Sequence, residues 1–303
     1  MTNSGPTPPS GAARWWAGAR LKTLPAAAVP VAVGTAVAAQ PDAGWSHGIV
    51  WWRALMALIV ALALQVATNY ANDYSDGIRG TDEDRVGPLR LVGSGLVPAR
   101  QVKMAAFAAF GVAGLAGLSL AAAVGWQLIV VGALCMLAGW FYTGGKNPYG
   151  YLGLGEIFVF VFFGLVATMG SEYVQTESLS QPGVLAGIAV GCLACALLVT
   201  NNLRDIPGDT EAGKKTLAVR LGDGSTRVLY LALIVGAFAF AVALAPWRVW
   251  ALVVLVAVPA ALPPLRAVFA GAKGLDLIPV LGGTGKLQMV FGLLLTIGLW
   301  ISV

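Results

Sequence analysis

Residues 50–76 read VWWRALMALIVALALQVATNYANDYSD, a long apolar run that ends in a polar, acidic segment. A helix needs about 20 mainly apolar residues to cross a bilayer, and residues 50–70 provide such a stretch. The acidic segment therefore begins where the apolar run ends. Carboxylates at a membrane boundary are costly to desolvate unless a cation neutralises them, so their presence indicates a functional site.

A second segment of the same kind follows another apolar run. Residues 201–209 read NNLRDIPGD, and the spacing of Asn201 and Asp205 repeats that of Asn72 and Asp76. Two acidic segments, each at the end of an apolar run, favour one shared site over two unrelated helix ends.

The composition predicts an all-α integral membrane protein. Hydrophobic residues make up 58% of the 303 residues and charged residues 11%, whereas soluble domains carry about 25% charged residues. The mean hydropathy is +0.79. Although the net charge is +5, the basic residues are dispersed among short loops and do not form the patch typical of nucleic-acid binding. The expected partner is the lipid bilayer, and no nucleic acid is expected.

Nine apolar stretches are candidates for membrane-spanning helices. They cover residues 24–40, 50–70, 104–124, 126–143, 152–170, 184–202, 227–245, 248–268 and 285–302. The sequence predicts a disordered N-terminal arm over residues 1–13, which is rich in Pro, Ser and Gly. Residues 14–303 are predicted to form a single transmembrane domain.

The distribution of Lys and Arg predicts the orientation in the cell membrane, because cytoplasmic loops carry an excess of both. With nine spans, 17 of the 19 basic residues fall on one side, and only Arg53 and Arg248 fall on the other. The prediction is a multi-pass protein with a cytoplasmic N-terminus and an outer C-terminus. Both acidic segments then lie on the cytoplasmic face.

The spacing of the acidic residues suits a magnesium site. In a helix, residues four apart share one face, so Asn72 lies beside Asp76 and Asp205 beside Asp209. Magnesium binds through a few carboxylates, waters and substrate phosphates. The alternative is that these Asn and Asp residues only cap helices and start turns.

Basic residues follow each acidic segment and predict a diphosphate ligand. Arg79, Arg85 and Arg90 follow the first, while Arg204, Lys214 and Lys215 lie in or after the second. Together with a metal ion, such cations would stabilise the charge on a departing diphosphate. A diphosphate site at the mouth of an apolar bundle suggests a ligand with a long hydrocarbon tail, such as a prenyl diphosphate.

The chain resembles the UbiA superfamily of intramembrane prenyltransferases. Residues 72–76 (NDYSD) are similar to its first Asp-rich motif and residues 205–209 (DIPGD) to its second. Four shorter segments look like the 1,4-dihydroxy-2-naphthoate polyprenyltransferases of menaquinone synthesis: residues 76–82 (DGIRGTD), 142–145 (YTGG), 155–156 (GE) and 213–217 (GKKTL). Gly80 stands where many members carry a further Asp, which leaves the roles of Asp73 and Asp82 open.

The resemblance implies nine transmembrane helices around a central cavity with a cytoplasmic cap. It implies that two magnesium ions, bridged by the diphosphate, are bound by Asn72, Asp76, Asp205 and Asp209. Arg79, Arg204, Lys214 and Lys215 would bind the phosphates. The implied reaction transfers a polyprenyl group to 1,4-dihydroxy-2-naphthoate with loss of carbon dioxide.

Further residues are candidates for contacts with the aromatic acceptor. Glu156 could orient or deprotonate its hydroxyl group, or could simply be a carboxylate favoured at a helix start. Gln65 and Asn69 are predicted to line the cavity. Three tyrosines could either line it or belong to an interfacial belt: Tyr142, Tyr149 and Tyr151. Other acceptors, 4-hydroxybenzoate or homogentisate, remain alternatives, and a cation-coupled transporter is a rival of a different class.

Overall fold

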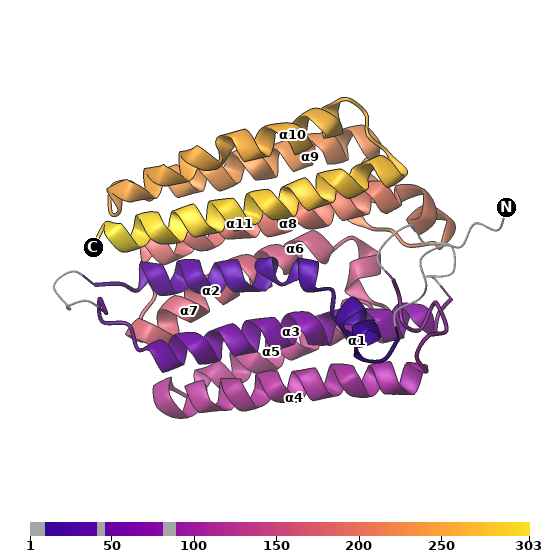
Figure 1. Cartoon of the computed structure of the whole chain (residues 1–303), viewed down its shortest axis with the longest axis horizontal. Coiled ribbons are helices and arrows are strands. Elements are labelled where there is room, and N and C mark those ends of the chain that lie inside the picture. The colour runs from indigo at the N-terminus through magenta and orange to yellow at the C-terminus, as the bar shows by residue number, and fades with distance from the viewer. Residues whose placement is uncertain (1–9, 41–45, 81–88) are drawn as a thin grey trace.

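The computed structural model describes residues 10–40, 46–80 and 89–303, and the regular elements in these ranges are helices (Figure 1). Asp82 and Arg85 lie outside the described residues. The principal elements are α1 (Ala12–Ala19), α2 (Pro25–Val37), α3 (Trp51–Gly77), α4 (Ala99–Val124), α5 (Gln127–Phe141), α6 (Gly155–Val159), the π-helical η3 (Phe160–Val166), α7 (Ala167–Thr176), α8 (Gln181–Glu211), α9 (Leu217–Val242), α10 (Val258–Phe269) and α11 (Leu277–Ile301). Short 3-10 segments are η1 (Leu21–Thr23), η2 (Tyr149–Leu152), η4 (Val249–Ala257) and η5 (Gly274–Asp276).

Within the described ranges, seven helices are long and apolar enough to cross a membrane. They are α3, α4, α8, α9 and three composite helices: α6 with η3 and α7, η4 with α10, and η5 with α11. Two shorter apolar helices, α2 and α5, correspond to the first and fourth predicted spans. The prediction of an all-helical membrane fold is confirmed.

Several helices extend beyond the apolar stretches that predict them. α9 begins at Leu217, although its apolar stretch starts at residue 227, and α11 begins at Leu277, ahead of residue 285. The added turns carry charged residues such as Arg220 and Asp223. Hydropathy marks the part of a helix that fits the hydrocarbon layer. In α9 the added part is a separate helical segment, because Gly222 (φ 76°, ψ 171°) interrupts the helical backbone and kinks it.

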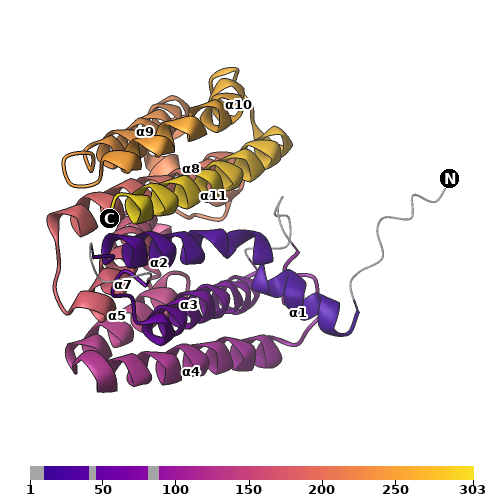
Figure 2. The same cartoon turned by 60° about the vertical axis from the view of Figure 1, so that its left-hand side comes forward.

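Successive long helices run in alternating directions (Figure 1). As a result, the carboxyl ends of α3 and α8, which carry the two acidic segments, lie at the same end of the bundle. α1 lies at this end and packs against α3 (Figure 2), where the Tyr70 hydroxyl donates to the Trp15 carbonyl at 2.8 Å. α1 begins at Ala12, two residues before the predicted start of the membrane domain.

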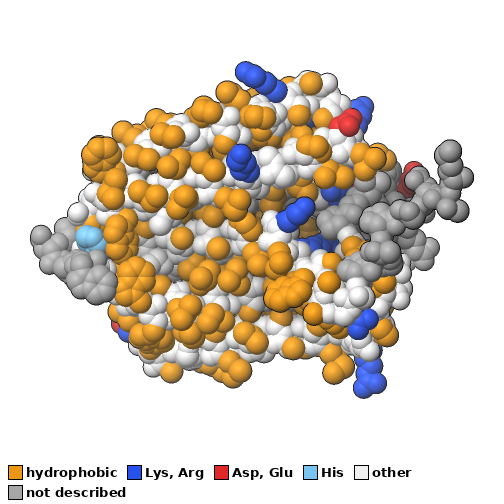
Figure 3. Space-filling view, viewed as in Figure 1, with side chains coloured by type: hydrophobic (Ala, Val, Ile, Leu, Met, Phe, Trp, Pro, Cys, Tyr) orange, Lys and Arg blue, Asp and Glu red, His pale blue; other side chains and the backbone are white. Residues whose placement is uncertain are grey.

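Two apolar clusters hold the bundle together. The larger one packs α2, α8, α9, α10 and α11 around fully buried side chains such as Tyr230 and Phe291. The smaller one joins α1, α3 and α4. On the face drawn in Figure 3, hydrophobic side chains cover most of the surface, and Lys and Arg side chains are few. A surface of this kind suits contact with lipid tails.

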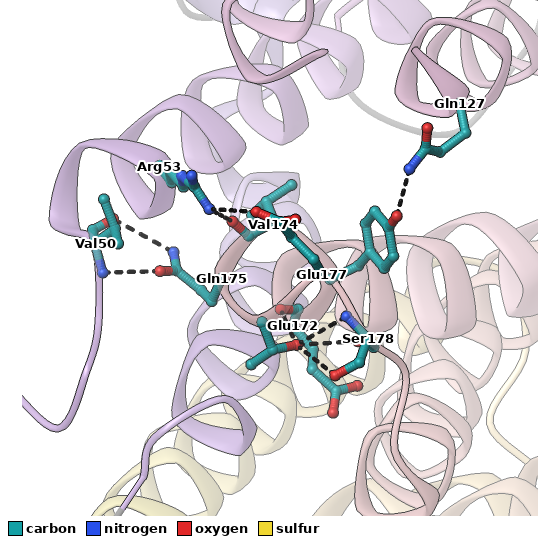
Figure 4. A network of polar contacts seen from close by, with 10 residues as sticks. Val50, Arg53, Gln127, Glu172, Val174, Gln175, Glu177 and Ser178 are labelled. Atoms are coloured by element: carbon teal, nitrogen blue, oxygen red, sulfur yellow. Dashed lines mark hydrogen bonds and ion pairs between the residues drawn. The ribbon is translucent and has the colours of Figure 1, made fainter. Parts of the chain in front are cut away.

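The opposite end of the bundle is joined by hydrogen bonds between α3 and α7 (Figure 4). The backbone N–H of Val50 donates to Gln175 at 2.9 Å, and Arg53 donates to the carbonyl of Val174 at 3.0 Å. Arg53 also lies 3.6 Å from Glu177. These contacts fix the start of α3, at the opposite end of the helix from the acidic segment.

Candidate active site

The first acidic segment forms the last turns of α3 and faces the connection between α5 and α6. Asp76 is only 3% exposed. Its Oδ1 accepts a hydrogen bond of 2.5 Å from the Tyr151 hydroxyl, and its Oδ2 lies 3.4 Å from Arg90. One turn earlier, Asn72 Oδ1 accepts from Thr143 Oγ1 at 2.8 Å. The predicted shared face of Asn72 and Asp76 is therefore directed at residues 143–151.

Asp73, within the same segment, makes contacts of a different kind. It is fully buried, and its two carboxylate oxygens accept the backbone N–H groups of Leu91 and Val92 at 2.8 and 3.0 Å. These bonds attach the connection before α4 to the end of α3. They also place Arg90 next to Asp76. Asp73 thus stabilises the wall of the site.

The second acidic segment continues α8 as a helix through Pro207 to Glu211. Arg204 forms a bidentate pair with Asp205, at 2.6 and 2.9 Å, and also donates to Asn201 at 2.7 Å. Asp209 lies one turn further on, where Thr216 donates to its Oδ2 at 3.5 Å. Arg204, predicted to bind phosphate, is in this structure held against the carboxylate next to it.

Tyr151, in η2, lies between the two acidic segments. Its hydroxyl donates to Asp76, and its backbone carbonyl accepts the N–H of Lys215 at 2.9 Å. The Lys214 ammonium lies 4.7 Å from the centre of the Tyr151 ring, and the Arg79 guanidinium lies 5.6 Å from it. Both distances fall within the range of cation–π attraction. Tyr151 therefore contacts both the end of α3 and the segment that follows α8.

The predicted phosphate-binding cations differ in their surroundings. Lys214 is 7% exposed and packs on Tyr151, whereas the side chain of Lys215 is exposed. The Arg79 guanidinium donates to the backbone carbonyls of Thr143 and Gly145. This contact ties the end of α3 to the segment that follows α5.

An apolar cavity of about 300 Å³ extends from this end into the bundle. Along α3 its lining extends from Ala57 to Asn72, one turn short of Asp76. Most of the wall is apolar, and its aromatic part contains Tyr142, Tyr149, Phe158, Phe162 and Phe163. Burial raises the pKa of the Tyr149 hydroxyl, which stays protonated and donates to the Ala138 carbonyl at 2.8 Å.

Gln65, Asn69 and Tyr142 line this cavity, as the sequence predicts. The first two also hold the N-terminal part of the chain in place. Asn69 donates to the Ala19 carbonyl at 2.9 Å and to Thr23 at 3.0 Å, and Gln65 donates to Thr23 at 3.1 Å. Their amides thereby fix the turn that leads into α2 against α3.

Glu156 faces α8 and is not among the residues that line the cavity. Its Oε1 accepts from Asn202 at 2.8 Å, while its Oε2 is buried without a hydrogen-bond partner in the described structure. Its neighbour Gly155 lies against the ring of Tyr142, which does line the cavity. The carboxylate is therefore placed just behind the cavity wall.

The donors at this end are carboxylate and amide oxygens, which are the ligands that magnesium prefers. Across residues 10–40, 46–80 and 89–303, no three His, Cys, Asp or Glu side chains form a group that could hold a metal ion. Such a group is not required for magnesium, which completes its shell with waters and substrate phosphates. The donor set fits a magnesium ion shared with a phosphate ligand.

From the sequence, Tyr151 is only one of several cavity or interfacial tyrosines, and Thr143 is only part of the segment 142–145. Neither is predicted to contact the first acidic segment. Tyr151 is one of three tyrosines between residues 142 and 151, and tyrosines are common at membrane interfaces. Its separation of 75 residues from Asp76 leaves no local pattern that would join them. The glycines around Tyr151 were the sequence pattern that could have indicated a tight connection. One of them, Gly153 (φ 75°), directly follows η2.

The fold and site define an integral membrane protein with an acidic, cation-lined mouth above an apolar cavity. A model of the UbiA prenyltransferase family matches residues 27–276. The chain belongs to the UbiA prenyltransferase family, and the resemblance inferred from its motifs is confirmed. The family is one of transferases, so the cation-coupled transporter is not retained as an alternative.

Relatives in bacteria cover nearly the whole chain. The 1,4-dihydroxy-2-naphthoate octaprenyltransferase of Mycobacterium tuberculosis (strain ATCC 25618 / H37Rv) is 52% identical over 283 residues, which are 93% of this chain and 94% of the relative. The protein of the same name from Escherichia coli (strain K12) is 37% identical and covers 95% of each chain.

Solved structures support the fold. A UbiA homolog from Aeropyrum pernix K1 aligns with a TM-score of 0.71 at 15% identity, over 92% of this chain and 98% of the other. A UbiA homolog from Archaeoglobus fulgidus bound to DMAPP and Mg²⁺ aligns with a TM-score of 0.65 at 15% identity, over 93% of this chain and 99% of the other.

Proposed function

We propose that the protein transfers a polyprenyl group from a polyprenyl diphosphate to 1,4-dihydroxy-2-naphthoate, in menaquinone biosynthesis. The observation that carries the proposal is that Asp76 of the first acidic segment, and Lys214 and Lys215 directly after the second, all contact Tyr151 near the mouth of an apolar cavity. The relatives named as naphthoate octaprenyltransferases, at up to 52% identity over most of the chain, favour this acceptor over 4-hydroxybenzoate or homogentisate.

Asn72 and Asp76 on α3, with Asp205 and Asp209 on α8, are the residues that would hold two magnesium ions. When bound, the metal supplies positive charge that stabilises the leaving diphosphate. The Mg²⁺ and DMAPP named for the Archaeoglobus structure support this assignment. Arg79, Arg204, Lys214 and Lys215 are the proposed phosphate contacts, where donors preorganised at the developing charge lower the barrier.

The apolar cavity is the proposed site of the reacting end of the prenyl chain. In the reaction, the C1–O bond of the allylic diphosphate breaks, and its electron pair leaves with the diphosphate. The ring carbon that bears the carboxylate then bonds to C1. As carbon dioxide leaves, the electrons of its bond return to the ring, and the product is demethylmenaquinol, the reduced form of demethylmenaquinone.

Tyr142, Gln65 and Asn69 are proposed to contact the substrates, since each presents a polar group in a mostly apolar wall. Glu156 is proposed to handle the hydroxyl proton of the acceptor. Its buried Oε2, which has no hydrogen-bond partner in the described part of the chain, supports a role beyond the contact with Asn202. A Glu156→Gln variant tests this role.

The membrane topology belongs to the same proposal. Seven long helices and the two shorter ones, α2 and α5, would make nine crossings around the cavity, with a cytoplasmic cap. The distribution of basic residues supports a cytoplasmic N-terminus and an outer C-terminus. Residues 14–303 would then act as one transmembrane domain in the cell membrane.

Carboxyl-labelled naphthoate provides the decisive test of the acceptor. Purified protein, incubated with this compound, magnesium and a polyprenyl diphosphate, should release labelled carbon dioxide one-for-one with prenylated quinol. The benzoate alternative would retain its carboxylate. Retention of the label in the product, or turnover with 4-hydroxybenzoate alone, would overturn the naphthoate assignment and leave the diphosphate chemistry standing.

A further inference from the structure

We infer that Tyr151 is a positioning residue that aligns Asp76 of the first acidic segment with Lys214, which follows the second, so that both act on one diphosphate. The inference rests on the proposed function and extends it to a residue outside both acidic segments. It begins from the placement of Tyr151 in η2, in the connection that passes between the ends of α3 and α8.

The hydroxyl of Tyr151 orients the Asp76 carboxylate. The bond is 2.5 Å long, in the range of hydrogen bonds between a hydroxyl and a carboxylate, which are stronger than neutral ones. Arg90 lies 3.4 Å from the other oxygen of Asp76. Each oxygen of Asp76 therefore has a partner, and the orientation of the carboxylate is set by Tyr151 and Arg90 as well as by α3.

The ring of Tyr151 orients the cation on the other side. The Lys214 ammonium lies 4.7 Å from the ring centre, and Lys214 is 7% exposed. A lysine side chain is flexible, so a half-buried ring beneath its ammonium restricts where the charge can be. The next residue is fixed as well, because the Lys215 N–H donates to the Tyr151 carbonyl at 2.9 Å.

These contacts give one residue a defined effect on two substrate-binding groups. Removing the hydroxyl releases Asp76 but keeps the ring beneath Lys214, whereas removing the ring releases both. Asp76 is proposed to act on the diphosphate through magnesium, and Lys214 directly. Since both must meet one diphosphate in a fixed geometry, loss of their alignment weakens diphosphate binding more than acceptor binding.

The test compares Tyr151→Phe, Tyr151→Leu and the control Tyr173→Phe. Tyr173 lies on α7 (Ala167–Thr176), away from the acidic segments, and its hydroxyl accepts a hydrogen bond from Gln127. The first readout is binding of geranylgeranyl thiolodiphosphate, an unreactive analogue, in magnesium by calorimetry. The second is KM for geranylgeranyl diphosphate against KM for the naphthoate.

Tyr151→Phe should raise the Kd of the analogue about 10-fold, the effect of losing one hydrogen bond to a charged group. Tyr151→Leu should raise it a few-fold further, because the contact with Lys214 is lost too. KM for the prenyl substrate should follow Kd, while KM for the naphthoate and both constants of Tyr173→Phe stay within about twofold of wild type.

A pair of variants at Lys214 tests the coupling directly. In a Lys214→Met background, the additional weakening from Tyr151→Phe to Tyr151→Leu should be smaller than in the wild-type background, since the ring then holds only the Arg79 guanidinium. Unchanged analogue binding in Tyr151→Phe would overturn the inference. So would equal increases in both KM values with a lower melting temperature of the ligand-free protein. If wild-type protein failed to bind the analogue, the proposed function itself would be wrong.

Discussion

Asp73 and Asp76 are three residues apart on α3, yet their carboxylates contact different kinds of partner. Asp73 is fully buried and satisfies the N–H groups of Leu91 and Val92, so its charge stabilises the loop before α4. Asp76 contacts the side chains of Tyr151 and Arg90. A backbone N–H pair holds a carboxylate in one place, whereas side-chain partners can move when a ligand binds. This contrast supports the proposed metal-binding role of Asp76 and a structural role for Asp73.

Replacing one carboxylate of the proposed metal site, Asp76 or Asp209, should nearly abolish turnover. Asp76→Asn and Asp209→Asn should each reduce kcat at least about 100-fold, as expected when a strong electrostatic contact to the transition state is lost. EDTA should stop the wild type, and magnesium should restore it. Prenyl transfer by purified, correctly inserted protein is the measurement. Asp276→Asn, at an exposed position in η5, is the matched control.

Full activity in either variant would leave these carboxylates with only a structural role, through their contacts with Tyr151 and Thr216. The same result with EDTA would remove the metal from the proposal.

At the scale of elements, the contact between η3 and α8 supports one wall of the cavity. Phe162 and Phe163 of η3 line the cavity, and Gly164 of η3 lies directly against the backbone of Gly187 and Gly191 on α8. Small residues allow helices to approach closely within membranes, where packing drives association. The close approach sets the distance between α8 and the aromatic wall.

Gly164→Ala should therefore force η3 and α8 apart. A Cβ at residue 164 would lie 2.5 Å from the Gly191 Cα and 2.8 Å from the Gly187 carbonyl oxygen, and both are backbone atoms that cannot rotate away. The expected result is a melting temperature lowered by several degrees, consistent with an overpacking cost of about 1–3 kcal/mol. Thermal unfolding in detergent measures it.

Gly111→Ala on α4 is the control, since a Cβ there meets nothing within 4 Å. It should leave the melting temperature unchanged or raise it, because alanine favours helices over glycine by about 1 kcal/mol. Equal melting temperatures for the two variants would contradict the packing account.

Hydropathy and helical spacing were enough to predict the helices and the two acidic segments, because both properties are local. The order of the apolar stretches matches α2 to α11, and Asn72 with Asp76 shares a face as predicted. The contacts of Tyr151 and the role of Asp73 could not be predicted this way. They depend on segments 75 and 18 residues away in sequence, which only the packed bundle brings together.

At the scale of the whole molecule, the proposed site residues lie at one end of the bundle, and hydrogen bonds between α3 and α7 close the other end. The acidic segments, Arg79, Lys214 and Tyr151 gather at the first end. Arg53, Gln175 and Glu177 join α3 to α7 at the second. This asymmetry agrees with the predicted excess of Lys and Arg on the cytoplasmic side.

Reporter fusions should reproduce that orientation. Fusions after Lys103 and after Lys215 should be cytoplasmic, whereas a fusion near Glu177 should be exported, because positive charge is retained in the cytoplasm. Paired phosphatase and fluorescent reporters at each position serve as mutual controls. An exported reporter at Lys215 would place the two acidic segments on opposite faces and remove the shared site.

The wall of the cavity is mostly apolar. Val131 of α5 lines the cavity and is 38% exposed, which suits contact with a hydrocarbon tail. For a transferase built this way, substrate tail and product both remain dissolved in the membrane. Its rate then follows the mole fraction of the isoprenoid among the lipids, a two-dimensional concentration. A cell that synthesises more phospholipid dilutes the substrate of this enzyme, even when the number of isoprenoid molecules is constant.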